Sequence, residues 1–264
     1  MSDVTVVCCY NNKKMYDEFI STLKTQTVQC EIIGIDNTGN NRFSSCSSAY
    51  NSAINQIKTK YVIYSHQDIL LNEPDTVEKF ISYLERIKCD DILGVAGMKF
   101  YSNITLTNIT HRDNKTGELV HLASFLSETS FFESGMTECD TLDECFFGGY
   151  TEHFRNYPFD EIVCNNWHLY AAEECLRTKS LNIGKVYACD VPLIHLSSGT
   201  RSVLFQYGFY RLCRKYSASF PFIRTTCAFS RTDFNHLFPR FLYVCCGAVL
   251  RRVGLYDAVI KFLP

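Results

Sequence analysis

The sequence lacks an uninterrupted apolar stretch near the roughly 18 residues that a membrane-spanning helix needs. Its first twelve residues also lack the basic start, apolar centre and small-residue cleavage site of a secretory signal. We therefore expect a cytoplasmic protein. Of its 264 residues, 46% are apolar, which is enough for a sizeable core and excludes a wholly disordered chain.

The 14 cysteines never occur in the Cys-x-x-Cys spacing that is typical of metal clusters and redox motifs. Several lie inside apolar runs, as Cys8, Cys9, Cys245 and Cys246 do. Disulfide frameworks are typical of short secreted chains. We therefore interpret the cysteines as reduced, buried thiols that pack as small hydrophobic side chains.

Acidic side chains are scarce at the end of the chain. Residues 200–264 contain two acidic and ten basic side chains, whereas residues 1–199 contain 26 acidic and 16 basic ones. The same C-terminal region holds 14 aromatic residues. A charge split of this kind predicts a separate, anionic partner for residues 200–264.

We favour a membrane surface as this partner, because basic and aromatic side chains together suit the lipid interface. The apolar stretch 242–250 is too short to span a bilayer but would fit an amphipathic helix lying in that interface. The protein would then be peripheral at the inner face of a membrane. The alternative is a helical appendage that packs on the preceding domain. We expect no nucleic acid as a partner.

Strand-like and helix-like segments alternate through the first half. Apolar, β-branched runs predict strands at residues 4–10, 30–36, 61–65 and 93–100, and helical spacing of apolar residues predicts helices at 15–23, 47–57 and 74–88. This alternation predicts an α/β fold, with a mostly parallel, Rossmann-like sheet and helices on both faces. We further expect a loop at 101–118, a helix at 167–180, a strand within 185–196, a domain boundary after Gly199 and a helical tail beyond it.

Polar side chains follow three of the predicted strands, at residues 11–12, 36–37 and 66–68. In open α/β sheets, ligands bind at the carboxyl ends of the strands. His66 and Asp68 are two residues apart, so both side chains point the same way from an extended segment. A carboxylate there suits a divalent cation, which in turn holds a diphosphate. The alternative is a turn in which Asp68 caps a helix.

Four stretches, in this order, resemble family 2-type glycosyltransferases of the GT-A fold: VTVVCCYNN, EIIGIDN, YVIYSHQDILL and CFFGGYTEHFRNYPFDE. The resemblance spans roughly residues 3–199. Three further stretches, SSCSSAYNSAI, HQD and NNWHLYAAEECL, are similar to a glycosyltransferase-like subgroup in which His-x-Asp replaces the Asp-x-Asp motif.

The resemblance implies transfer of a sugar, with inversion, from a nucleotide-sugar donor such as a UDP-sugar to a hydroxyl of a glycan or lipid-linked acceptor, as in polysaccharide synthesis. It assigns five residues to the donor site: Asn11, Asp36, Asn51, His66 and Asp68. It assigns three ligands to a divalent metal, Mn²⁺ or Mg²⁺: Asp68, His66 and His195. It assigns three residues to the acceptor side: Gly148, Gly149 and Trp167.

The sequence departs from the family pattern at the catalytic base. Members usually place an acidic pair a few residues beyond Phe-Asp-Glu, but here that position falls on residues 167–169. His168 is a candidate base because its reference pKa lies near neutrality. The competing carboxylates are Asp143, Asp160, Glu161 and Glu174.

Two other functions remain as alternatives. The missing acidic pair favours a degenerate, non-catalytic protein that binds a nucleotide or acts as a scaffold. A nucleotidyltransferase on a related fold would need a glycine-rich, basic loop after the first strand to hold a triphosphate. The actual stretch, YNNKKMYDE, has two lysines but no glycine, which disfavours it.

Overall fold

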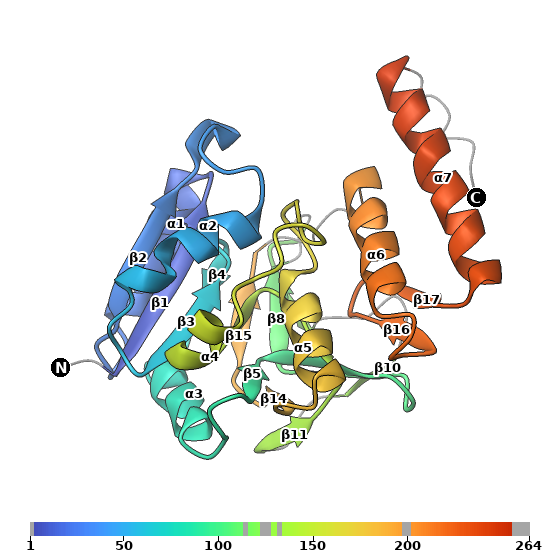
Figure 1. Cartoon of the computed structure of the whole chain (residues 1–264). Helices are drawn as coiled ribbons and strands as arrows, with labels where there is room; N and C mark the ends of the chain where they lie inside the picture. The colour runs from blue at the N-terminus through green and yellow to red at the C-terminus, as the bar shows by residue number, and fades with distance from the viewer. Residues whose placement is uncertain (1–2, 113–115, 122–127, 131–133, 197–201, 255–264) are drawn as a thin grey trace.

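The computed structural model of the chain describes residues 3–112, 116–121, 128–130, 134–196 and 202–254. A seven-stranded sheet lies at its centre (Figure 1). Across this sheet the strands follow in the order β11 (Met136–Glu138), β14 (Val186–Cys189), β5 (Ile92–Gly94), β13 (Phe146–Tyr150), β3 (Tyr61–Ser65), β1 (Val4–Tyr10) and β2 (Glu31–Asp36). Five strands run in one direction, and β13 and β11 run in the opposite one. The predicted mostly parallel sheet is therefore confirmed.

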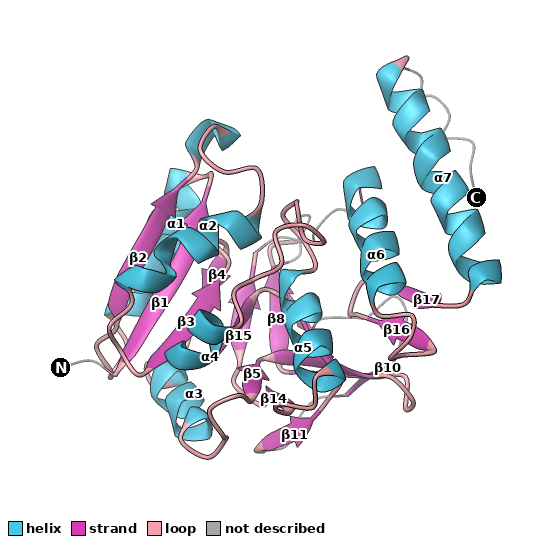
Figure 2. Cartoon of the chain, viewed as in Figure 1, coloured by secondary structure: helices cyan, strands magenta, loops and turns pink. Residues whose placement is uncertain are grey.

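Helices cover both faces of this sheet, as predicted (Figure 2). One face carries α1 (Lys13–Lys24) and α3 (Thr76–Leu84); the other carries α2 (Cys46–Ala53) with its 3₁₀ extension η2 (Ile54–Gln56), α4 (Thr151–Asn156), α5 (Tyr170–Ser180) and α6 (Val203–Lys215). In β1, Val6 and Cys8 pack under α1 and α3, whereas Val7 packs under α2 and α5. Both faces of the strand are buried, so its sequence is an unbroken apolar run.

The strand predicted at residues 93–100 is two strands. It breaks at Val95, after which β6 (Ala96–Lys99) leaves the central sheet and joins a second one. That sheet has the order β10 (Glu128–Ser130), β7 (Ile104–Thr107), β6 and β12 (Thr141–Leu142).

The prediction of a loop at residues 101–118 is wrong, because this segment contains β7 and β8 (Ile109–Arg112). Threonine alternates with apolar residues there, and the side chains of Thr105 and Thr107 are fully buried. β-branched threonine suits a strand, so the polar appearance of the segment was misleading.

A third sheet brings two distant segments together. Its order is β4 (Ile69–Leu70), β15 (Leu193–His195), β8 and β9 (Leu119–His121). The single strand predicted within 185–196 is therefore split into β14 and β15. Because β15 pairs with β4, the end of β15 lies beside the segment that follows β3.

The C-terminal region is largely helical, as predicted, but it also contains a hairpin of β16 (Phe222–Arg224) and β17 (Phe229–Arg231). Phe205 and Phe209 of α6 belong to the same hydrophobic core as α2 and α5. The last helix, α7 (Phe234–Arg252), packs beside α6 at the edge of the molecule (Figure 1). The boundary predicted after Gly199 lies outside the described residues.

Two further sequence predictions concern the thiols and the membrane. All 14 cysteines lie in the described part of the chain, and each is a free thiol. Eight of them are buried as predicted, but Cys89, Cys227 and Cys246 are exposed, and Cys9, Cys30 and Cys245 are only partly buried. Within the same residues, no helix combines the length and the apolar character that crossing a membrane requires.

Gly148 and Gly149 lie in the middle of the central sheet, where β13 pairs with β3 on one side and β5 on the other. A Cβ atom on Gly148 would lie 2.0 Å from the carbonyl oxygen of Val62. Both glycines are buried within these paired strands. The structure shows that they allow close strand packing, and their acceptor-side role stays a prediction.

We predict that Gly148→Ala lowers the free energy of unfolding by at least about 2 kcal/mol, because the added Cβ must displace main-chain atoms of β3. Gly149→Ala should cost clearly less, since its Cβ would meet the Asp91 carbonyl oxygen at 3.0 Å. Urea denaturation measures both values. An unchanged midpoint for Gly148→Ala would contradict this packing.

Candidate active site

Three side chains with metal-binding groups meet beside β3 and β15. His66 and Asp68 follow β3, and His195 is the last residue of β15. Asp68 Oδ1 is 3.8 Å from His66 Nδ1, and Asp68 Oδ2 is 3.4 Å from His195 Nε2. One ligand atom from each residue lies within 4.8 Å of the others. We refer to these residues as the His66–Asp68–His195 cluster.

Backbone contacts fix His195 beside Asp68. His195 is paired with Ile69, the residue that follows Asp68, and the amide of Leu196 donates to the Asp68 carbonyl oxygen at 2.9 Å. On the other side of β15, His111 Nδ1 donates to the His195 carbonyl oxygen at 3.1 Å. The position of His195 is therefore set by sheet pairing on both sides of its strand.

The surroundings of the cluster act differently on its two imidazoles. Burial lowers the pKa of His66, although Asp68 opposes this effect. Burial also disfavours charge on His195, but Asp68 and Asp143 outweigh it and raise the pKa of His195. The neutral form of His66 is the form that binds metals.

Gln67 joins the ends of β1 and β3, a role that the sequence analysis missed. Its Oε1 accepts the amides of Asn11 at 3.0 Å and Asn12 at 2.8 Å, and its Nε2 donates to Asn11 Oδ1 at 2.8 Å. The sequence predicts an extended segment at residues 66–68, but Gln67 and Asp68 lie in a turn. The alternation of side chains along a strand therefore does not explain why Gln67 faces β1.

Asp143 lies near the cluster, just before β13. The Thr226 hydroxyl donates to its Oδ2 at 2.6 Å, and the Cys145 amide donates to its Oδ1 at 3.1 Å. Burial disfavours the charged form, but Thr226, His195 and His66 outweigh it and lower the pKa of Asp143. A fixed negative charge therefore faces the two histidines.

His168 lies in the loop before α5, because α5 begins at Tyr170 and not at Trp167 as predicted. Its Nδ1 is 3.9 Å from Glu144 Oε2, and about a third of its side chain is exposed. Its ring packs edge-on against Phe205 of α6. Burial, followed by the charge of His66, lowers the pKa of His168 and favours its neutral form.

Tyr170 connects the cluster to this loop. Its hydroxyl lies 3.1 Å from His66 Nε2 and donates to the Glu144 carbonyl oxygen at 3.5 Å. Burial and then the negative charge of Asp143 raise the pKa of Glu144 well above its usual range. His168, Glu144 and Asp143 are thus gathered around the cluster.

Asp36 ends β2 at the same edge of the sheet and is exposed. Its Oδ1 accepts the Thr38 amide at 2.8 Å, at the start of the short helix η1 (Thr38–Asn40). Hydrogen bonds from Thr38 lower the pKa of Asp36, so the carboxylate is ionised at neutral pH. The neighbouring Asn37 is buried, and its Oδ1 accepts the amides of residues 42 and 43, which holds this loop in place.

Three further candidates, Asn51, Asp160 and Glu161, lie where the 159–161 segment meets α2 and α6. Asn51 Oδ1 accepts the Phe159 amide, and Asn51 Nδ2 donates to Glu161 Oε1, both at 2.9 Å. Asp160 Oδ2 accepts Lys215 Nζ at 2.8 Å. Asn51 therefore joins α2 to the 159–161 segment.

Two other candidates contact the interior of the domain. Glu174 is buried, pairs with Arg177 and faces His153 Nε2 at 3.0 Å. Trp167 is partly buried and packs against the core beneath α2, α5 and α6.

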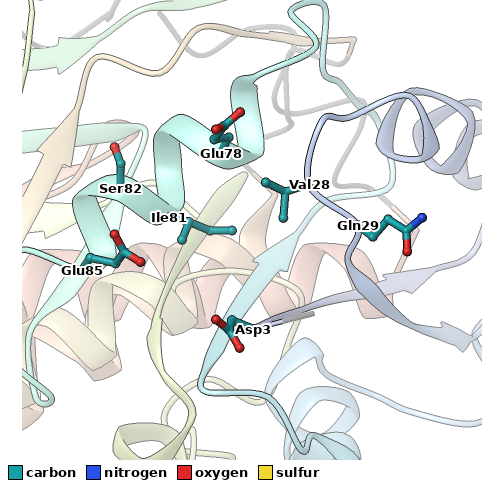
Figure 3. Close-up of a pocket in the computed structure, with 7 residues that line it drawn as sticks. All are labelled: Asp3, Val28, Gln29, Glu78, Ile81, Ser82 and Glu85. Carbon is teal, nitrogen blue, oxygen red and sulfur yellow. The ribbon is translucent and has the colours of Figure 1, made fainter. Parts of the chain in front are cut away.

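An open pocket of about 520 Å³ lies at the opposite, amino-terminal end of the strands (Figure 3). Its lining residues come from α3 and from the segments that precede β1 and β2. Asp3, Glu78 and Glu85 contribute carboxylates to it. Like charges repel a diphosphate, so this pocket is a poor donor site.

The fold is similar to that of several solved glycosyltransferases. A structure of GalNAc-T7 with UDP, GalNAc and Mn²⁺ has a TM-score of 0.56 at 11% identity over 83% of this chain and 51% of that one. Residues 1–349 of TarS from S. aureus, with UDP-GlcNAc, give 0.53 at 15% over 83% and 66%. The mannosyltransferase PcManGT from Pyrobaculum calidifontis, with GDP-Man and Mn²⁺, gives 0.51 at 10% over 81% and 62%. The chain thus spans about half to two thirds of their lengths.

This likeness confirms the GT-A fold that the sequence resemblance implied. A search of curated proteins by sequence found no match. A model of the glycosyltransferase-like family matches residues 5–195, from within β1 to the end of β15, and this range contains all three residues of the His66–Asp68–His195 cluster. The chain therefore belongs to the glycosyltransferase-like family.

Proposed function

We propose that this protein transfers a sugar from a nucleotide donor, a UDP-sugar, to a hydroxyl group of a glycan or lipid-linked acceptor. The His66–Asp68–His195 cluster carries the proposal, since it lies where α/β sheets bind ligands. Membership of the glycosyltransferase-like family supports it. The similar structures that contain UDP-GlcNAc, or GDP-Man with Mn²⁺, support the class of donor.

The cluster fits a divalent cation. The buried Nε2 atom of His195 makes no well-aligned hydrogen bond among the described residues, and it lies 3.4 Å from Asp68 Oδ2, a second candidate ligand. A cation would be held between these two groups. Two imidazoles and one carboxylate suit Mn²⁺ better than Mg²⁺, which prefers oxygen ligands. A bound cation would neutralise negative charge on the departing nucleoside diphosphate.

We assign donor recognition to the edge formed by β1, β2 and β3. The ionised, exposed carboxylate of Asp36 would accept a hydrogen bond from the uracil ring. Asn11, which Gln67 holds beside His66 and Asp68, would contact the donor at the end of β1.

For the acceptor we propose His168 as the base. Its imidazole takes the hydroxyl proton while the acceptor oxygen bonds to the anomeric carbon. The bond from that carbon to the diphosphate oxygen breaks, and its electron pair leaves with the nucleoside diphosphate. Attack from the opposite face inverts the carbon. Asp143 has a lowered pKa, which makes it a weaker base than His168. Asp160 is paired with Lys215 of α6, and Glu161 accepts a hydrogen bond from Asn51.

The proposed function is tested with a panel of nucleotide sugars, each with and without Mn²⁺. The matching donor should raise the melting temperature by several degrees in a Mn²⁺-dependent way, because ligands stabilise the state that they bind. Release of free nucleotide should then be measurable with that donor. Binding without release would favour the degenerate protein, and no shift with any donor would contradict the proposal.

We predict that Asp68→Asn weakens Mn²⁺ binding at least about tenfold in calorimetric titration, because it removes a negative ligand from the cation. His195→Ala should weaken it similarly. Asp75→Asn, at an exposed position before α3, is the matched control and should bind normally. If His195→Ala lowers only the melting temperature while the folded protein keeps its Mn²⁺ affinity, His195 is structural.

We also propose that α7 binds an anionic membrane surface. Five exposed apolar side chains of the helix, and Val253 directly after it, follow one another at helical spacing: Phe234, Phe238, Phe241, Leu242, Val249 and Val253. The opposite side buries Val244 and Gly247 towards the domain. The helix contains no acidic residue and ends at Arg251-Arg252. An apolar ridge flanked by arginines suits the interface of an anionic bilayer.

Vesicle co-sedimentation tests this surface. Binding should rise when phosphatidylserine is added to phosphatidylcholine and fall with salt, because each engaged arginine contributes about 1 kcal/mol that salt screens. The Phe238→Ser/Leu242→Ser variant should bind weakly. Tyr101→Ser, which removes a ring that is 84% exposed elsewhere, should bind normally. Equal binding to both kinds of vesicle, or none to either, would leave α7 without this role.

A further inference from the structure

Leu169 has an unusual backbone conformation for its residue type. Its φ of 74° and ψ of 3° lie in the left-handed region, immediately before α5. The other non-glycine residues with positive φ in the described part of the chain are all asparagines: Asn40, Asn103 and Asn182. A leucine at positive φ brings its Cβ close to the next carbonyl group, so another contact must stabilise it.

Glu144 supplies that contact. Its Oε1 accepts the backbone amide of Leu169, although the two residues belong to different loops. Only 14% of the Glu144 side chain is exposed, and Leu169 is buried. A hydrogen bond to a carboxyl group in such surroundings is stronger than one in water.

The turn at Leu169 sets the direction of both its neighbours. On one side it places His168, whose Nδ1 is 3.9 Å from Glu144 Oε2. On the other side it starts α5, so that the Tyr170 hydroxyl reaches His66 Nε2 at 3.1 Å. A helical conformation at Leu169 would turn His168 elsewhere.

We propose that Glu144 is the positioning residue for the base: it holds the left-handed turn at Leu169 and thereby places His168 beside the His66–Asp68–His195 cluster. This inference rests on the proposed function, in which His168 takes the acceptor proton. Glu144 acts through the loop and does not take that proton.

Four variants separate this role from the alternatives. Glu144→Gln keeps an oxygen that accepts the amide of position 169, whereas Glu144→Ala removes it. Leu169→Gly allows positive φ without strain. Leu169→Ala is its matched control, because it loses nearly the same side chain but keeps the Cβ. Each Leu169 variant is made with and without Glu144→Ala.

Glu144→Ala should lower kcat on the order of a hundredfold with the donor KM and Mn²⁺ affinity unchanged, because it misplaces a catalytic group. It should also speed hydrogen exchange of the amide at position 169 at least about tenfold. Glu144→Gln should stay within about threefold of the unchanged protein in both measurements. Adding Leu169→Gly to Glu144→Ala should restore kcat about tenfold, and adding Leu169→Ala should not.

Loss of kcat in Glu144→Gln with slow exchange at position 169 would overturn the proposal and make Glu144 the base itself. Equal behaviour of Leu169→Gly and Leu169→Ala beside Glu144→Ala would also overturn it. Hydrogen exchange needs no substrate, so it measures the stability of the turn at position 169 even when no donor is turned over. A protein that fails the donor panel but shows the exchange pattern would contradict the proposed function and keep the role of Glu144 in the turn.

Discussion

The antiparallel pairing of β15 with β4 is the contact on which the candidate site depends. His66 and Asp68 are close in the sequence, but His195 lies far along the chain, and this pairing brings its strand against the segment that follows β3. The register places His195 opposite Ile69. A shift by one residue would turn the imidazole to the other face of the small sheet. The cluster therefore exists only while two short strands, each buried on its core side, keep this alignment.

Local patterns predicted the parts of the fold that local physics determines. The strands β1 and β3 are buried on both faces, so their apolar runs are visible in the sequence. The positions of His66 and Asp68 followed from the end of such a run. His195 came from the family resemblance, because no local pattern marks a ligand at the end of a three-residue strand. The break at Val95 was invisible for a similar reason, since both halves are equally apolar.

The contacts that the sequence did not predict all join separate loops. Gln67 binds the turn after β1, Glu144 binds the amide of Leu169, and Thr226 binds Asp143. Each uses a residue type that is common on surfaces, and its partner lies far away in the chain. Periodicity reports the face on which a residue lies, but it cannot report which polar group that face meets.

The basic side chains of residues 200–264 lie in two different environments. Lys215 contacts Asp160 and the buried Glu173, and the Arg240 guanidinium lies 4.9 Å from the ring centre of Phe209. These cations belong to the packing between α6 and its neighbours. Arg251 and Arg252, at the end of α7, are exposed.

The depth at which α6 is buried decides how the chain can be shortened. A chain cut near residue 199 would lack Phe205 and Phe209, so the apolar sides of α2 and α5 would be exposed to water. It would also lack the hydrogen bond from Thr226 to Asp143. Such a fragment would be expected to aggregate, although it contains every residue of the family match. A chain cut after β17 would lose only α7 and the residues that follow it. It would keep the β16–β17 hairpin, whose Thr226 contacts Asp143. In this family member the folded unit is therefore longer than the stretch that the family model matches.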